Sequence, residues 1–365
     1  MLVVAKIGTS SITLPDGGVS AGAIAKLATD VSAARAAGYA VVLVTSGAVT
    51  AGVAALSPAG ERPFDPVGLQ AMAAIGQHRL MRQYDEALAR HGMLAGQVLL
   101  APLDFGHRQR YLHARKTLSR LLELGVVPVV NENDAIADDE IRFGDNDRLA
   151  ALVAHLMQAE ILVLLTDTSG LLSADPRLDD DATLIEEVAR IDGAGEQLAG
   201  GPGSDSARGG MAAKLAAAKM ATWSGVRTVI AAADRPGVLL DAVAGAPGVG
   251  TVFLPHARSL PARKLWIAFA LKPKGRLLVD AGARRALVER GTSLLAAGVV
   301  AVEGGFGEED AVELCGPDGV VFAKGIAGLP SSRSGEWIGR RTQDLPDELR
   351  YEVIHRDDLV LLVDS

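Results

Sequence analysis

Acidic and amide side chains gather after residues 126–130, a run of β-branched residues typical of a buried strand. The polar residues in question are Asn131, Asp134, Asp145, Asn146 and Asp147. They lie at the end of a strand and just before an apolar segment, 148–158, that is typical of a helix. Open α/β sheets bind their ligands at this position. The cluster can hold an ammonium group, a hydroxyl or hydrated Mg²⁺, whereas carboxylates alone would repel phosphate; a solvated acidic loop is the alternative.

Two lysines far apart in the sequence supply the cations that a phosphate site needs. Lys6 lies on the first predicted strand, two residues before Gly8, where phosphate can approach backbone N–H groups. Alternatively, Lys6 is an edge lysine whose ammonium group reaches solvent. Lys214 lies one turn inside a predicted helix that opens with Gly209 and Gly210, and such a helix start leaves N–H donors for an anion. An ordinary junction between loop and helix is the alternative there.

Two more predicted strands end in polar residues. Ser46 follows the strand at 40–44, where its hydroxyl can bind a ligand carboxylate or simply cap the next helix. Thr166 and Asp167 end the apolar strand at 161–165, and they can form an adenine and ribose rim or a routine turn. The hypothesis therefore depends on whether the fold brings these strand ends and the two lysines together.

Strands alternate with helices through the first 255 residues. The predicted strands are 2–7, 40–44, 94–100, 126–130, 161–165 and 228–231. The predicted helices are 21–37, 69–91, 111–124, 148–158 and 209–224. Because several strands are almost wholly apolar, we expect an α/β fold with a largely parallel sheet sandwiched by helices on both faces.

The composition changes near residue 252, and a chain of 365 residues is long enough for two domains. Short β-like segments separated by Gly, Pro and Asp then predict a small β-rich barrel. We expect a first domain at 1–257, a linker at 258–273, a barrel at 274–350 and a C-terminal tail at 351–365.

The bulk composition favours a globular cytoplasmic protein. The net charge of −8 argues against strong nonspecific nucleic-acid binding. Cys315 is the single cysteine, so no internal disulfide can form, and we expect this residue to be buried on a strand in a protein of a reducing compartment. The N-terminus lacks the features of a signal peptide, and no uncharged apolar run is long enough to span a bilayer.

An ordered set of segments resembles the glutamate 5-kinase family, within the amino acid kinase superfamily. The segments are VVAKIGTS, VTSGAV, NENDAI, FGDNDRLAAL, LLTDTSGL, ADPR and GGMAAKL, all before residue 255. The later segments VDAGARRAL and RGTSLLAAGVVAVEG, with Phe306, resemble the PUA domain that is fused to many of these kinases.

The resemblance implies that ATP phosphorylates the γ-carboxylate of L-glutamate, giving glutamyl 5-phosphate, the first intermediate of proline synthesis. Mg²⁺ would act mainly through the ATP phosphates, with Asp145 as its one candidate ligand. Lys6 and Lys214 would stabilise the transferred phosphate and Asp147 would orient them. Ser46, Asp134 and Asn146 would bind glutamate. The nucleotide-binding residues would be Lys6, Gly8, Thr166, Asp167, Arg208, Gly209, Gly210, Met211, Ala212, Ala213 and Lys214.

The resemblance further implies feedback inhibition by proline, a homodimer or homotetramer, and transfer of the product to a glutamyl phosphate reductase. This sequence departs from the family in its nucleotide loop. Arg208 replaces a small hydroxyl residue, and Ala212 and Ala213 replace hydroxyl residues. Side-chain hydrogen bonds to phosphate from these positions are therefore in doubt.

Rival functions come from the same superfamily and from other classes. The acetylglutamate, aspartate, carbamate and uridylate kinases are the nearest enzymes, although the NENDA segment and the second domain favour glutamate. An RNA-binding or regulatory factor is a further alternative, but residues 272–365 contain 12 Lys and Arg against 16 Asp and Glu, a net charge of −4. A dehydrogenase is disfavoured because no G-x-G-x-x-G turn follows a strand, and the Walker A pattern is absent too.

Overall fold

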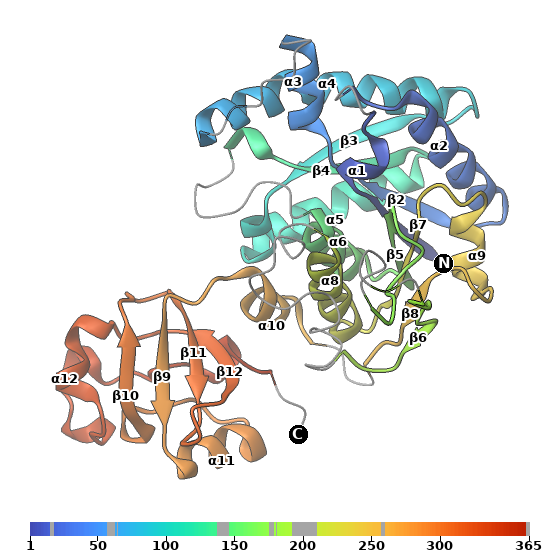
Figure 1. The fold of residues 1–365 in the computed structure, drawn as a ribbon. Coiled ribbons are helices and arrows are strands. Elements are labelled where there is room, and N and C mark those ends of the chain that lie inside the picture. The colour runs from blue at the N-terminus through green and yellow to red at the C-terminus, as the bar shows by residue number, and fades with distance from the viewer. Residues whose placement is uncertain are drawn as a thin grey trace. The chain divides into compact units, whose positions relative to one another are not determined.

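The chain divides into two compact units, Met1–Ser259 and Leu260–Ser365 (Figure 1). The structure, a computed structural model, describes residues 1–14, 18–56, 63, 65–136, 146–174, 179, 181–191, 210–256 and 260–362. None of the described helices combines the length and the apolar character needed to cross a membrane.

The first unit is an α/β domain. Its strands are β1 (Leu2–Ile7), β2 (Ala40–Val44), β3 (Ala95–Leu100), β4 (Val127–Glu132), β5 (Ile161–Thr166), β6 (Glu187–Val188), β7 (Arg227–Ala232) and β8 (Thr251–Phe253). Its helices are α1 (Thr9–Ile12), α2 (Ala21–Ala36), α3 (Ala48–Leu56), α4 (Pro66–Ala89), α5 (Arg108–Glu123), α6 (Asn146–Met157), α8 (Met211–Trp223) and α9 (Val238–Ala244). Two short 3₁₀ turns, η1 (Pro102–Phe105) and η2 (Asp134–Ile136), follow β3 and β4.

One sheet organises this unit, with the strand order β3-β4-β2-β1-β5-β7-β8-β6. The six strands from β3 to β7 in this order pair in parallel, and β8 runs antiparallel to β7. The prediction of a largely parallel sheet is therefore confirmed. The chain moves from β1 to β2 on one side and later crosses from β4 to β5 on the other. The carboxyl end of β1 is thus a topological switch point, where open α/β sheets place their ligand sites.

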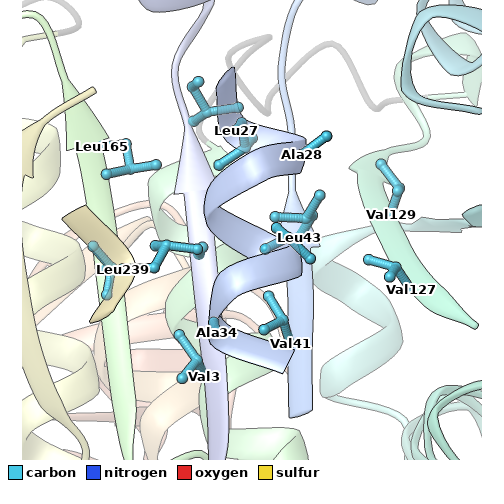
Figure 2. Packing of buried hydrophobic residues seen from close by; sticks show 14 of the residues in the cluster. Val3, Leu27, Ala28, Ala34, Val41, Leu43, Val127, Val129, Leu165 and Leu239 are labelled. Carbon is cyan, nitrogen blue, oxygen red and sulfur yellow. The ribbon is translucent and has the colours of Figure 1, made fainter. Parts of the chain in front are cut away.

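Apolar side chains fill both faces of the sheet because its central strands are buried along almost their whole length. Figure 2 shows one face, where Leu27, Ala28 and Ala34 of α2 pack over Val3, Val41 and Leu43 of the sheet, with Val127, Val129, Leu165 and Leu239 in the same cluster. Since strand side chains alternate between faces, Lys6 lies on the opposite face from Val3, the face where α6 contacts β1.

Helices α3 and α4 approach each other unusually closely. A Cβ atom added at Gly76 of α4 would lie 1.8 Å from the carbonyl oxygen of Ala48, and one at Gly52 of α3 would lie 1.9 Å from the carbonyl oxygen of Met72. Only glycine fits at either contact. This packing places α4 against α3, the helix that follows the turn after β2.

The second unit is built on a five-stranded sheet with the order β10-β9-β11-β12-β13. Its strands are β9 (Gly275–Val279), β10 (Val299–Gly304), β11 (Ala311–Cys315), β12 (Val321–Ile326) and β13 (Leu359–Leu361). Helix α11 (Ala281–Arg290) follows β9, and the short α12 (Ser334–Trp337) places Trp337 in the core with Phe322 and Phe306. Cys315 is buried and free at the end of β11, as expected.

Two segments of the second unit are more ordered than the sequence predicts. Residues within the expected linker form α10 (Ala262–Leu265) and a π-helical turn (Trp266–Ala270), and Ile267 packs with Val360. Residues beyond 350, expected as a tail, include β13, which pairs with β12. Both segments are short and flanked by polar residues, so periodicity gives little signal for them. The exact domain bounds stay a prediction.

Candidate active site

Two buried lysines meet on one carboxylate at the carboxyl end of β1. The Nζ atom of Lys6 lies 2.6 Å from Oδ1 of Asp147, and the Nζ atom of Lys214 lies 3.4 Å from Oδ2 of the same residue. The exposed fractions of the three residues are only 4%, 6% and 4%, in the order Lys6, Lys214, Asp147. Taking ammonium groups out of water is costly unless anions meet them. An arrangement of two cations around one carboxylate is therefore suited to a further, ligand-borne negative charge.

Three elements far apart in sequence place these groups. Lys6 is the penultimate residue of β1, Asp147 is the second residue of α6, and Lys214 is in the first turn of α8. Helices α6 and α8 pack against each other beside β1. The predicted meeting of the two lysines is thus found, and it follows from the convergence of parallel strand ends and helix starts at one edge of the sheet.

The start of α8 and the β1–α1 turn both leave room for an anion. Among the described residues, no side chain caps α8, whose first residues are Met211, Ala212 and Ala213 after Gly210, so the N–H groups of this first turn can bind an anion. A Cβ atom at Gly8 would lie 3.5 Å from the Nζ atom of Lys6, which shows that this turn passes close to the ammonium group.

A second set of polar side chains continues from Asp147 toward β4. The Nδ2 atom of Asn146 donates hydrogen bonds to Oγ of Ser46 at 2.9 Å and to Oδ1 of Asn131 at 3.1 Å. All three residues are buried. Because Asn146 and Asp147 are adjacent, the Ser46 network and the lysine cluster are joined at the start of α6. The Oδ1 atom of Asn146 has no hydrogen-bond donor among the described residues.

Asp134 is a buried carboxyl group in the turn η2, directly after β4. Its exposed fraction is 7%, and its Oδ1 atom has no donor within the described part of the chain. Burial raises the pKa of Asp134 to about 6. A pocket of about 240 Å³ opens beside it, lined by Asp134, Asn133, Glu132, Gln77 and other residues of α3, α4 and β3. A cationic ligand group here would stabilise the ionised form of the buried carboxyl group.

Thr166 and Asp167 lie at the carboxyl end of β5, the strand next to β1. Thr166 is buried and its hydroxyl donates to Oδ1 of Asp167 at 3.0 Å, while Asp167 itself is exposed. The pair is therefore at the same edge of the sheet as Lys6.

Several predicted site residues cannot be compared with the structure. Asp145, Arg208 and Gly209 lie outside the described residues. The sequence placed Asn131 in the polar cluster without assigning it a binding role, and it gave no indication of Gln77. Asn131 lies at the polar end of β4, whereas Gln77 in the Ala-rich α4 carries no recognisable signal.

Metal binding through protein side chains has little support in the described part of the chain. No group of three or more His, Cys, Asp or Glu side chains is arranged there to hold a metal ion. Both oxygens of Asp147 already contact lysines. This set of groups therefore fits phosphate oxygens better than a directly bound metal ion.

Comparison with protein families agrees with this fold. The model described as the amino acid kinase family matches residues 1–232, and that of the PUA domain matches residues 275–345. The chain belongs to the amino acid kinase family, and the resemblance indicated by its motifs is confirmed.

Curated relatives match this chain over nearly its whole length. Glutamate 5-kinase of Trichlorobacter lovleyi is 46% identical, and the match covers 100% of this chain and 97% of that protein. Glutamate 5-kinase of Geobacter sulfurreducens is 45% identical, with 99% and 97% covered, and that of Mycobacterium tuberculosis is 46% identical, with 98% and 94% covered. A solved isopentenyl phosphate kinase of T. acidophilum is 19% identical with a TM-score of 0.45 over 69% of this chain and 100% of that chain, which is too distant to bear on function.

Proposed function

We propose that this chain transfers the γ-phosphoryl group of ATP to the γ-carboxylate of L-glutamate, giving L-glutamyl 5-phosphate for proline synthesis. The observation that carries the proposal is the meeting of Lys6 and Lys214 on Asp147 at the switch point of the sheet. The identity of about 45% to curated glutamate 5-kinases over nearly the whole chain supports the choice of glutamate.

The reaction needs alignment and charge neutralisation more than proton transfer. The γ-carboxylate is already ionised at neutral pH. One of its oxygens forms a bond to the γ-phosphorus while the bond from that phosphorus to the β,γ-bridging oxygen breaks, and ADP leaves. Both reactants are anions, so Lys6 and Lys214 lower the barrier by stabilising the charge on the transferred group. Asp147 keeps the two ammonium groups together before the nucleotide arrives.

Glutamate would bind along the network that leads away from the lysines. Its ammonium group would meet the carboxylate of Asp134 and Oδ1 of Asn146, and Oδ1 of each residue is a buried acceptor without a hydrogen-bond donor among the described residues. The hydroxyl of Ser46 would contact a carboxylate of the substrate. The pocket beside Asp134 would accommodate the ammonium end of glutamate.

The nucleotide would bind across the ends of β1, β5 and α8. Gly8 and the first N–H groups of α8, from Gly210 to Lys214, would hold phosphate oxygens. Thr166 and Asp167 would form the rim for adenine and ribose, and Arg208 and Gly209 would belong to the loop before α8. Mg²⁺, carried by the ATP phosphates with Asp145 as its one candidate protein ligand, would neutralise part of their charge.

The loss of one lysine tests the assignment. Lys214→Ala should lower kcat at least ~100-fold, because one well-placed electrostatic contact in a dry site contributes about 3–4 kcal/mol to catalysis. ADP release with L-glutamate as acceptor is the measurement. Lys116→Ala, on the exposed surface of α5, is the matched control and should keep its activity. Turnover of Lys214→Ala within a few-fold of wild type would refute the role of the two lysines.

A substrate panel separates this function from its superfamily rivals. L-Glutamate should be phosphorylated with much higher kcat/KM than acetylglutamate, aspartate or carbamate, because only glutamate offers both the ammonium group and the correct length. A preference for acetylglutamate, whose ammonium group is blocked, would contradict the role of Asp134.

The remaining features follow from the same proposal. We propose proline as a feedback inhibitor, a homodimer or homotetramer, a glutamyl phosphate reductase as the recipient of the labile product, and a cytoplasmic location. Nucleic acid is an improbable partner of the second unit. Several of its cations are paired within the unit, for example Arg276 with Glu313 at 2.9 Å and Arg284 with Asp318 at 2.9 Å.

A further inference from the structure

Helix α4 adds one more residue, Gln77, to the hydrogen-bonded network of Ser46, Asn131 and Asn146. The Oε1 atom of Gln77 accepts a hydrogen bond of 2.7 Å from Nδ2 of Asn131. Among the described residues, Gln77 makes no hydrogen bond to Ser46 or Asn146. Gln77 also lines the pocket beside Asp134, and its hydrogen-bonded link to Asn146 runs through Asn131.

These hydrogen bonds fix the orientation of the side-chain amides of Asn131 and Asn146. Oδ1 of Asn131 accepts from the backbone N–H of Glu132 at 2.9 Å and from Nδ2 of Asn146 at 3.1 Å. The Nδ2 atom of Asn131 must then find an acceptor, and Gln77 provides it. With Asn131 held this way, Asn146 donates through Nδ2, and its Oδ1 is left as an acceptor for a ligand.

The rest of α4 makes this support rigid. The close contact of Gly76 with Ala48 fixes the helix at the residue before Gln77. Two turns later, the buried hydroxyl of Tyr84 lies 2.7 Å from the hydroxyl of Thr45, the residue before Ser46. Helix α4 therefore supports the network at two points, at Asn131 through Gln77 and next to Ser46 through Tyr84.

We propose that Gln77 is a positioning residue for the ammonium group of the amino-acid substrate. It orients Asn131, which orients Asn146 so that Oδ1 of Asn146 faces the ammonium group. This inference rests on the proposed function, and it adds a residue that sequence patterns do not reveal. Without an acceptor at position 77, the amide of Asn131 can rotate, and that of Asn146 can then follow.

The test compares two identical substitutions on the same helix. Gln77→Leu should raise the KM for L-glutamate about 10-fold, the effect expected for one lost hydrogen bond in a buried network, with little change in the KM for ATP. Gln83→Leu, at a half-buried position of α4, should leave both values unchanged. Gln77→Glu retains an oxygen that can accept from Asn131 and should recover most of the affinity.

Glutarate distinguishes positioning from a general structural effect, because it retains both carboxylates of glutamate and lacks the ammonium group. The inhibition constant of glutarate against glutamate should be the same for wild type and Gln77→Leu. In an Asn146→Ala background, Gln77→Leu should raise the KM for glutamate less than about 2-fold further, because residues in one network are not additive.

Two results would overturn the inference. One is a glutamate KM of Gln77→Leu equal to that of wild type. The other is a 10-fold effect that persists in full with Asn146→Ala or appears equally with glutarate. Either result would leave the proposed function standing, provided that the wild-type enzyme phosphorylates glutamate. A wild-type enzyme without that activity would instead refute the proposed function itself.

Discussion

Replacing Asp134 by asparagine should make the protein more stable and its substrate binding weaker. Burial raises the pKa of Asp134 from 3.8 to about 6. Between these values the folded chain holds the proton more tightly than the unfolded chain, so the stability falls as the pH rises through that interval. Above pH ~6 the ionised carboxylate costs the folded state the full difference of about 2 pKa units, or about 3 kcal/mol.

The expected gain therefore depends on pH. Asp134→Asn should raise the free energy of unfolding by about 3 kcal/mol at pH 8 and by less than about 1 kcal/mol at pH 4, where the native carboxyl group is already protonated. Thermal unfolding without substrate, at several pH values, measures the difference. Asp85→Asn, on the exposed surface of α4, controls for the substitution itself and should show no such pH-dependent gain.

The same carboxylate should govern the affinity for glutamate. In the wild type, the KM for glutamate should fall as the pH rises from 5 to 7, because Asp134 then becomes ionised and can pair with the ammonium group. In Asp134→Asn the KM should be at least ~10-fold higher at pH 8 and nearly independent of pH over this range. The reasoning is wrong if the variant is no more stable than wild type at pH 8, or if its stability gain is equal at pH 4 and pH 8.

Three further substitutions test other parts of the structure. Asp147→Asn should lower kcat about 100- to 1000-fold in an ADP-release assay, because the neutral amide no longer holds two ammonium groups in place; a kcat near that of wild type would contradict this role. Gly76→Ala should destabilise the first unit by about 3 kcal/mol in thermal unfolding, because its new Cβ atom would lie 1.8 Å from the carbonyl oxygen of Ala48; an unchanged Tm would show that α3 and α4 can separate. Lys324→Met should lower the Tm of the second unit, since the buried ammonium group donates to the carbonyl oxygens of Ala268 in the π-helical segment and of Leu271 just after it; equal Tm values would show that these carbonyl oxygens find other donors.

The sequence was sufficient to predict the central sheet because its strands are long, apolar and β-branched. β1 and β5 match their predicted ranges to within one residue. The shortest strands escaped prediction. β8 has three residues and follows Gly248 and Gly250, so neither length nor periodicity marks it as a strand. It is formed by its pairing with β7, which is a tertiary contact.

The site divides in the same way. Lys6 lies at the end of a strand and Lys214 at the start of a helix. In an α/β sheet the carboxyl ends of parallel strands and the starts of the following helices lie along the same edge, so the two lysines could be expected to meet there. Gln77 could not be predicted, because its partner Asn131 is 54 residues away and the contact depends on how closely α4 approaches α3. That distance is set by Gly76, whose role appears only once the helices are packed.

The last strand of the second unit has a consequence for biosynthesis. β13 consists of Leu359–Leu361 and completes the edge of a sheet whose other strands begin at Gly275. During translation, domains generally fold from the N-terminus onward. The second unit cannot pair β13 with β12 until residues 359–361 have been synthesised and have left the ribosome, so a chain that stops before Leu359 would leave β12 as an exposed edge.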